Sequence, residues 1–500
     1  MFRAASECIA KCRVDEIVAA SAKLQHDALV YLVRALILGS VRSHAVDELS
    51  DTPSPGDDLF SEEASQLCLD LLTQITLLNE HRIVMIWVLV YEHMTDIIAS
   101  EVSPKALVQR TIGNLLLLCV SFFRHREITD QLIKCVQYML RPAEKMRSPL
   151  VCYKFSAATL RMLVVNPAAL LSAAHWGTTM AALRFAVLSP EGAANVVLSV
   201  KLVLHFCGMD RENMMEIGKA AALNGLTLPP REAAQRGPLT YAQWRDMLGL
   251  LEALSKQDQA EAAVSGTVLV DLIGALDVVY LSSPALVEAK APEEGEEALE
   301  RSERHWRHGW QPVLSLLCDL CCHRQSLVRH AAITALQCLL LSNQMSQCSP
   351  PLWRLCFKTI LLPMLEHLAS LTGRKAAAVD PVHLEQTRMR AFAVVHKIFL
   401  IYLPLLAKLD DFADLWGNIL DCNERYLLIP ENALLAEMVP ESLKNLLLVL
   451  YDCQLLEEGK PLAVYTWDRV GKFRLNVNLR DEVLREATPP PPLPASEKKN

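Results

Sequence analysis

One helix-length segment, residues 325–336, limits most strongly what this chain can fold into. Its apolar positions and the residue that continues them recur at i, i+4, i+8 and i+11: Val328, Ala332 and Leu336, then Leu339 just beyond the segment. That spacing places them on one face of an α-helix. Arg329 follows the first of them, and the small side chain of Ala332 lets a neighbouring helix approach closely. The pattern is typical of the second helix of a HEAT-type helical hairpin.

A related pattern occurs at Thr387–Val394, where arginines are again interspersed with small and apolar residues. Helical hairpins of this kind stack because a single hairpin cannot bury its own apolar face. A stacked array offers a binding surface rather than a deep active site. On periodicity alone, an ordinary irregular helical domain remains the alternative.

Glycine is scarce in this chain, at 18 of 500 residues, and apolar residues make up 52%. Proteins contain about 7% glycine on average, and sheet-rich folds need many glycine turns, so the scarcity favours helices. The apolar fraction suffices for a large core and excludes wholesale disorder. We therefore predict an all-α fold in which stacked helical hairpins form a HEAT/armadillo-like α-solenoid.

Breaks in the helical pattern divide the chain into six segments. Proline-containing polar stretches and one acidic stretch separate the helical regions. The predicted order is an N-terminal helical box (1–42), a loop (43–60), a helical repeat region (61–224), two helices plus an acidic linker (225–303), a C-terminal HEAT-like region (304–470) and a Pro-rich, largely disordered tail (471–500).

Charge and cysteine usage exclude several classes of protein. The net charge is −8 and no basic tract is interleaved with aromatic residues, so nucleic-acid binding has little support. The 15 cysteines are scattered over apolar helix faces and no apolar secretory segment precedes them, so free thiols in reducing cytosol are expected. Met162–Leu183 is uncharged and has the length of a transmembrane helix, but Asn166-Pro167 should split it into two helices.

Motifs for catalysis or cofactor binding are not found in the sequence. It has no phosphate-binding loop, no dinucleotide fingerprint and no His-Glu-x-x-His zinc motif. Cys318–His323 has metal-like spacing, but a structural zinc site needs a second ligand pair, so core thiols are favoured. Glu92 and His93 are interpreted as a buried polar pair at a helix kink. We predict no catalytic, cofactor-binding or metal-binding residues.

Several segments together resemble one protein family. They are Ile86–His93, Lys397–Leu400, Phe412–Trp416 with Ile419-Leu420, Val439–Leu450, and Thr466–Val470 with Leu479–Val483. They resemble the region downstream of the exchange domain in large ARF guanine-nucleotide exchange factors of the Golgi brefeldin-A-resistance (GBF/Gea/GNOM) class. Val439–Leu450 is the most specific match, and the resemblance is weaker at residues 225–303.

The resemblance implies a non-catalytic role. The family's Sec-seven exchange domain carries a glutamate finger within an FRLPGE-type motif, and no such motif occurs in this sequence. The chain looks like the part of an exchange factor that follows this domain. We therefore expect that it is not an enzyme by itself.

The resemblance also implies a membrane-facing helix. In the family, the first box downstream of the exchange domain contributes to membrane association through an amphipathic helix, which matches residues 13–41 here. The expected membrane face consists of Leu29, Leu32, Val33, Leu36 and Ile37. Its polar side is only weakly basic, so attraction to anionic lipid would be slight. The alternative is that this face packs on the next hairpin. Both descriptions apply in turn if the helix is docked in solution and undocks at a membrane.

Two functions follow as hypotheses. The first is a regulatory scaffold of a Golgi-type ARF exchange factor, cytoplasmic and peripheral on Golgi and early secretory membranes. Its expected partners are small GTPases of the ARF or Rab type and Golgi membrane lipids, with self-association also considered and no nucleic acid. The alternative is an unrelated cytosolic HEAT/armadillo adaptor that acts only through protein–protein interaction.

Overall fold

A computed structural model describes residues 13–45, 57–146, 148–187, 189–207, 222, 225–230, 239–261, 266–281, 303, 306–346, 348–371, 381–429, 433–473 and 478–487. These residues form helices and the turns between them, and none of them belongs to a strand. The chain divides into two compact units, Met1–Val264 and Ser265–Asn500. The prediction of an all-α fold is confirmed.

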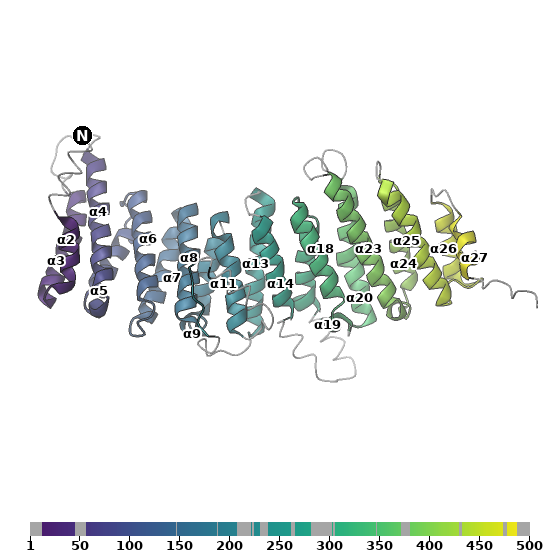
Figure 1. Ribbon diagram of the computed structural model, residues 1–500, viewed down its shortest axis with the longest axis horizontal. Helices are drawn as coiled ribbons and strands as arrows, with labels where there is room; N and C mark the ends of the chain where they lie inside the picture. The colour runs from purple at the N-terminus through teal and green to yellow at the C-terminus, as the bar shows by residue number, and fades with distance from the viewer. Residues whose placement is uncertain are drawn as a thin grey trace, which may run out of the picture. The chain divides into compact units, whose positions relative to one another are not determined.

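The first unit stacks its helices in two layers (Figure 1). Helices α3, α5, α7 and α10 lie side by side in one layer, and α4, α6, α8 and α11 form the other. The elements are α2 (Val14–Ala20), η1 (Ser21–Lys23), α3 (His26–Ala45), α4 (Asp57–Leu78), η3 (Glu80–Arg82), α5 (Ile83–Ala99), α6 (Lys105–Phe122), α7 (Thr129–Met146), α8 (Pro149–Val165), α9 (Pro167–Leu170), α10 (Trp176–Val187), η4 (Pro190–Gly192), α11 (Ala193–Phe206) and α13 (Tyr241–Glu261).

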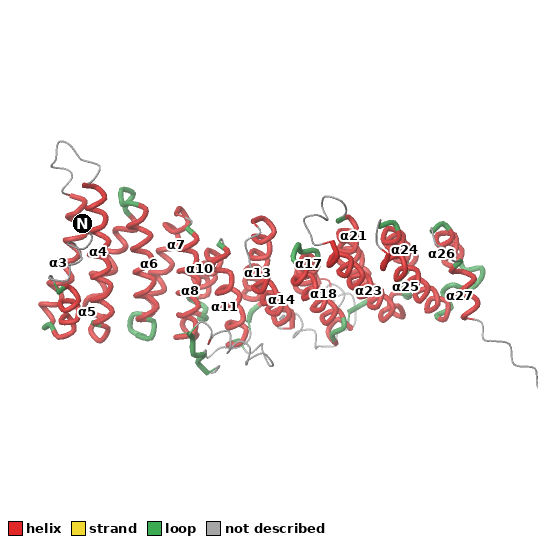
Figure 2. Tube along the Cα trace, turned by 45° about the horizontal axis from the view of Figure 1, so that its top comes forward, coloured by secondary structure: helices red, strands yellow, loops and turns green. Residues whose placement is uncertain are grey.

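The second unit has the same two-layered arrangement (Figure 2). One layer contains α14, α18, α23, α25 and α27, and the other contains α17, α20 with α21, α24 and α26. The elements are α14 (Gly266–Leu281), η6 (Trp306–Trp310), α17 (Gln311–Cys321), α18 (Ser326–Leu340), α19 (Asn343–Ser346), α20 (Pro350–Cys356), η7 (Phe357–Leu361), α21 (Leu362–Ser370), α23 (Pro381–Leu406), α24 (Phe412–Leu427), α25 (Ala433–Asp452), α26 (Pro461–Gly471) and α27 (Leu479–Ala487).

The arginine of the segment at 325–336 closes a hairpin turn. Arg329 is completely buried. Its Nη1 donates to the backbone carbonyls of His323 (2.9 Å) and Arg324 (2.8 Å), which lie in the turn between α17 and α18. Its Nε donates to the hydroxyl of Thr387 on α23 (2.9 Å), so one side chain joins two successive hairpins.

Arg388, in the related segment at 387–394, has the same role one hairpin later. It donates to the carbonyls of Leu368 (3.0 Å) and Leu371 (2.6 Å) at the end of α21. Helix ends leave carbonyls without intrahelical partners, and each arginine satisfies two carbonyls of the helix end or turn that precedes its own helix. The shared sequence pattern therefore reflects a shared way of closing the turn.

Proline explains the irregular helix in the middle of the second unit. Helices α20 and α21 are joined by the π-helical turn η7, and Pro363 lies in the first turn of α21. Proline has no N–H to donate, and its ring clashes with the carbonyl four residues earlier. A π-helical turn does not require the hydrogen bond from residue i to residue i−4 at the proline, so the helix can continue.

The segment 162–183 is broken as predicted. α8 ends at Val165, and the side chain of Asn166 accepts a hydrogen bond from the backbone N–H of Ala169 at the start of α9. Two other stretches, Lys105–Phe122 and His383–Leu406, are long and apolar enough to cross a membrane. Both are half buried against other helices, at 50% and 56%, as core helices of a stacked array are.

One part of the predicted tail is ordered. Residues 479–487, expected within a largely disordered segment, form α27 and pack on α25. Leu479 and Val483 bury their side chains there, and Lys444 of α25 pairs with Glu486 at 2.6 Å. The polyproline run at 489–494 and most of the acidic linker lie outside the described residues. The six segment boundaries remain predictions.

Candidate functional site

The expected membrane face lies mostly inside the first unit. Leu29 and Val33 of α3 are completely buried. The other members of the face, Leu32, Leu36 and Ile37, are half-buried, because α3 packs on α4 and α5. In this structure the face belongs to the core between helices, so its contact with a membrane stays a prediction that requires α3 to undock.

Polar contacts, among them those of Arg82 and His93, hold α3 and the preceding turn in place. Arg82, just before α5, donates to the carbonyls of Leu24 (2.6 Å) and Ser21 (3.1 Å). His93 of α5 forms a buried hydrogen bond of 2.7 Å between its Nε2 and the hydroxyl of Ser40 on α3. Release of α3 has to break the contact between His93 and Ser40 and the hydrogen bond from Ser65 of α4 to the carbonyl of Ser40 (2.9 Å), and Arg82 anchors the turn that leads into α3.

His93 belongs to Ile86–His93, one of the segments that resemble the exchange-factor family. Burial lowers the pKa of its imidazole, which favours the neutral form. Glu92 is exposed, so the expected buried pair of Glu92 and His93 is wrong. On a helix, adjacent residues point in different directions, and only His93 faces α3.

The Val439–Leu450 segment contributes a second buried histidine link. The hydroxyl of Ser442 on α25 lies 2.6 Å from Nδ1 of His396 on α23. Nε2 of His396 lies 3.3 Å from the amide nitrogen of Asn423 on α24. Burial lowers the pKa of His396 to about 3. So weak a base cannot accept a proton in catalysis near neutral pH, and this contact joins three helices.

The cysteines near 318–323 lie in the core of the second unit. Cys318 and Cys321 are buried, and burial raises the pKa of both thiols well above its ordinary value. Metal binding and nucleophilic attack both need the thiolate. Among the residues that the structure describes, no three histidine, cysteine or carboxylate side chains form a group that could hold a metal ion.

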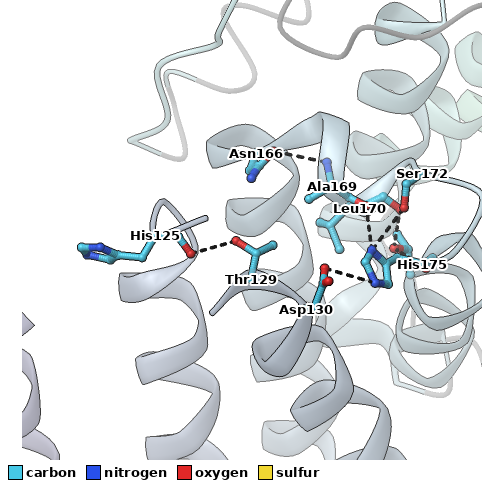
Figure 3. Close-up of polar contacts among 9 residues, drawn as sticks. His125, Thr129, Asp130, Asn166, Ala169, Leu170, Ser172 and His175 are labelled. Atoms are coloured by element: carbon cyan, nitrogen blue, oxygen red, sulfur yellow. Dashed lines mark hydrogen bonds and ion pairs between the residues drawn. The ribbon is translucent and has the colours of Figure 1, made fainter. Parts of the chain in front are cut away.

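A serine, a histidine and an aspartate meet where α7, α9 and α10 approach one another (Figure 3). The Oγ of Ser172 lies 3.1 Å from Nδ1 of His175, and Nε2 of His175 lies 3.6 Å from Asp130. However, Nδ1 also lies 3.2 Å from the carbonyl of Ala169. A carbonyl oxygen only accepts, so a hydrogen bond to Ala169 places the proton on Nδ1, and in that tautomer Nδ1 cannot deprotonate Ser172. The arrangement closes a turn.

The space near this turn is too small for a substrate. A cavity between α7, α8, α9 and α10 has room for roughly one water molecule, and Ser172, His175 and Asp130 do not line it. Its walls are Ile133, Val136, Thr159, Met162, Leu170, Thr178, Thr179 and Ala182. The geometry gives no support to an enzyme active site here.

The residues that connect the helices were not among those predicted from the sequence, although some of them carry a signal in it. Ser40 continues the apolar series Leu29, Val33, Leu36 at helical spacing, and it is buried. A polar residue in register with an apolar face needs a buried partner. That rule identifies Ser40 as a linking residue, but the partner His93 is known only from the structure.

Neighbouring hairpins are further joined by ion pairs that no local pattern indicated. Arg110 of α6 donates to Asp70 of α4 (2.9 Å), and Asn114 donates to the same carboxylate (3.0 Å). Burial alone would raise the pKa of Asp70, but these hydrogen bonds lower it. In the second unit Arg354 pairs with Asp411 at 2.5 Å. These pairs are partly exposed, so they contribute little to the stability of the fold. Their main effect is to fix how neighbouring helices are aligned.

Comparison with known proteins places the chain beside exchange factors. Residues 310–476 match the family model described as "GBF1-like, tetratrico peptide repeat region". The chain is 27% identical over 483 residues to the ARF guanine-nucleotide exchange factor GNOM of Arabidopsis thaliana, which covers 95% of this chain and 30% of GNOM. It is 24% identical to GNL1 of the same plant, over 99% of this chain and 32% of GNL1.

A third relative matches a shorter part of the chain. The Golgi-specific brefeldin A-resistance guanine nucleotide exchange factor 1 homolog of Caenorhabditis elegans is 34% identical over 192 residues, which are 38% of this chain and 9% of that protein. No solved structure matches the chain. The chain thus spans about a third of the length of GNOM and GNL1. It is homologous to a part of the ARF guanine-nucleotide exchange factors of the GNOM and GBF1 type.

Proposed function

We propose that this chain is a non-catalytic regulatory scaffold of an ARF guanine-nucleotide exchange factor, supporting membrane recruitment and ARF regulation in Golgi vesicle transport. The observation that carries the proposal is the match of 95% of the chain to 30% of GNOM. Two stacks of helical hairpins without a substrate-sized cavity near the Ser–His–Asp turn are consistent with a binding role. ARF or Rab GTPases and Golgi lipids are the proposed partners.

Membrane recruitment through α3 needs a conformational step. Because Leu29 and Val33 are buried, α3 must leave α4 and α5 before its apolar side can enter a bilayer. The contacts of Arg82 and His93 oppose this step. Loss of either contact should therefore increase the population in which α3 is free to bind lipid.

Flotation of the purified chain with liposomes of Golgi-like lipid composition tests the membrane part of the proposal. We expect partial flotation of the wild type, more flotation of Arg82→Ala, and loss of that gain when Leu32→Ser and Leu36→Ser are added. Arg161→Ala, which changes an exposed arginine of α8, serves as the matched control and should float like the wild type. If neither the wild type nor Arg82→Ala floats, with or without GTP-loaded ARF, the cytosolic adaptor is the better description.

A further inference from the structure

Helices α18 and α23 present a row of basic side chains to solvent. The two helices lie side by side in one layer of the second unit (Figure 1). Arg390 and Lys397 of α23 are exposed, as is His383, while His330 of α18 is half-buried. Together with Thr334, which is exposed on α18, these residues define the α18–α23 basic face.

The two permanent cations of this face have no carboxylate partner among the residues that the structure describes. Nη2 of Arg390 donates to the hydroxyl of Thr334 at 3.2 Å, which leaves its charge uncompensated. By contrast, Arg110, Arg354 and Arg425, which also connect neighbouring helices, each pair with a carboxylate. A partly exposed guanidinium held by a neutral hydroxyl keeps donors available for an anion.

The surroundings of His330 are cationic. The pKa of His330 is lowered by burial and then by the charges of Arg390, Arg329 and His383, and no carboxylate opposes these effects. The nearest acidic residue along α23, Glu385, lies about three helical turns before His396 and on the same side of the helix. Since His396 faces α25 through Ser442, Glu385 points away from α18.

Three acidic residues on α25 and α27 surround a lysine of α25. Lys444 of α25 lies within the field of Glu441, Glu482 and Glu486 and pairs with the last of these. The basic face is therefore a local excess of positive charge on a chain whose net charge is −8. Such a local excess attracts an oppositely charged partner.

The size of the face selects the class of partner. Two permanent charges and two histidines are fewer than the four to eight Lys or Arg residues that typically bind anionic membranes, and the face carries no aromatic side chain for stacking nucleic-acid bases. Further along the two helices, Leu341 is 37% exposed and Ile401 is 47% exposed. A row of cations followed by apolar side chains matches an acidic peptide that also carries apolar residues.

We propose that the α18–α23 basic face binds an acidic peptide segment of a partner protein. Arg390 and Lys397 pair with its carboxylates, and Leu341 with Ile401 contacts its apolar side chains. This inference rests on the charges of the second unit and does not depend on the proposed function.

The binding test uses the full chain and a short fluorescein-labelled peptide with a glutamate-rich half and a leucine-containing half. Fluorescence anisotropy should show binding that weakens as salt increases. Arg390→Glu with Lys397→Glu should weaken it by about tenfold or more. Arg161→Glu reverses the charge of an exposed arginine of α8 and is the control for non-specific attraction. Circular dichroism and thermal unfolding verify that each variant is folded.

Cysteine footprinting gives a second readout on the wild-type chain. Cys338 is exposed on α18, one helical turn after Thr334, while Cys453 is exposed just after α25. The peptide should slow alkylation of Cys338 several-fold and leave Cys453 unchanged, as measured by mass spectrometry. This comparison needs no substitution and cannot fail through misfolding.

Any one of four results would overturn the proposal. The first is equal binding of the acidic peptide and of a peptide with glutamine in place of each glutamate. The second is a loss of affinity in Arg161→Glu as large as in the double variant. The third is unchanged alkylation of Cys338 at saturating peptide. Binding to phosphatidylserine vesicles through Arg390 and Lys397, without peptide binding, would also reject it in favour of a lipid site.

Discussion

At the scale of single residues, polar side chains buried among apolar neighbours connect one helix to the next. Arg329 and Arg388 satisfy carbonyls at hairpin turns, and His93 and His396 each bond a serine of an adjacent helix. Burying such groups is costly unless they find partners, so each link is specific to one arrangement of helices. They explain why an array whose apolar residues make up 52% of the chain adopts a defined register.

Removing Arg329 should destabilise the second unit more than removing an exposed arginine. Arg329→Ala leaves two carbonyls and the Thr387 hydroxyl without their donor, which we expect to cost about 2–4 kcal/mol. Urea unfolding followed by tryptophan fluorescence measures the loss. Arg390→Ala, on the exposed side of α23, is the matched control and should change stability by less than about 0.5 kcal/mol. Similar effects from both variants would contradict the role of Arg329.

Stability should fall in mild acid because of His396. Its pKa is about 3 in the folded chain and about 6.5 when unfolded. Between these values the unfolded state binds the proton and the folded state does not, so stability is lost as pH falls below about 6.5. One pH unit below that value the loss is about 1.4 kcal/mol. His396→Gln should reduce the pH dependence of the urea concentration at which half of the protein is unfolded. His367→Gln, which changes an exposed histidine, should leave that pH dependence unchanged.

The sequence predicted which residues matter at this scale better than it predicted their partners. Arg329 stood out because it follows the first apolar residue of a HEAT-type helix pattern, and the structure shows it fully buried. Its acceptor Thr387 is 58 residues away in the chain, and no local pattern encodes a contact at that separation. The error at Glu92 has the same origin, because pairing along the chain does not imply pairing in space.

At the scale of helices, the spacing of apolar residues in the sequence predicted the positions of most helices. The break at Asn166-Pro167 was predictable because proline cannot continue a helix and restricts the residue before it. Helix α27 was missed because its residues are mostly charged, and only Leu479 and Val483 anchor it on α25. The residues around α27 include few apolar ones and are followed by a run of prolines, so a helical period of apolar residues could not be recognised there.

Docking of α3 should depend on Arg82. Arg82→Ala removes the donors to the carbonyls of Ser21 and Leu24, so the turn before α3 loses its attachment to α5. We expect faster hydrogen–deuterium exchange across His26–Ala45, with little change in α24 or α25. Mass spectrometry of peptic peptides measures this directly. Unchanged exchange in α3, or an equal increase in Arg161→Ala, would show that Arg82 does not hold the helix.

At the scale of the whole molecule, composition and periodicity sufficed for the fold class but not for the function. Scarce glycine and repeated apolar faces indicate stacked hairpins, and such stacks serve many binding roles. The link to exchange factors came from particular segments and is supported by matches over 95% and 99% of the chain. Partners remain proposals because the chain spans only about a third of those relatives.

We propose above that this chain is the part of an exchange factor that does not itself exchange nucleotide. The most direct test measures release of a fluorescent GDP analogue from ARF on liposomes, with the purified chain added in excess and EDTA-induced release as the positive control. We expect a release rate equal to the spontaneous rate at every concentration of the chain. Release that accelerates in proportion to the concentration of the chain would contradict it.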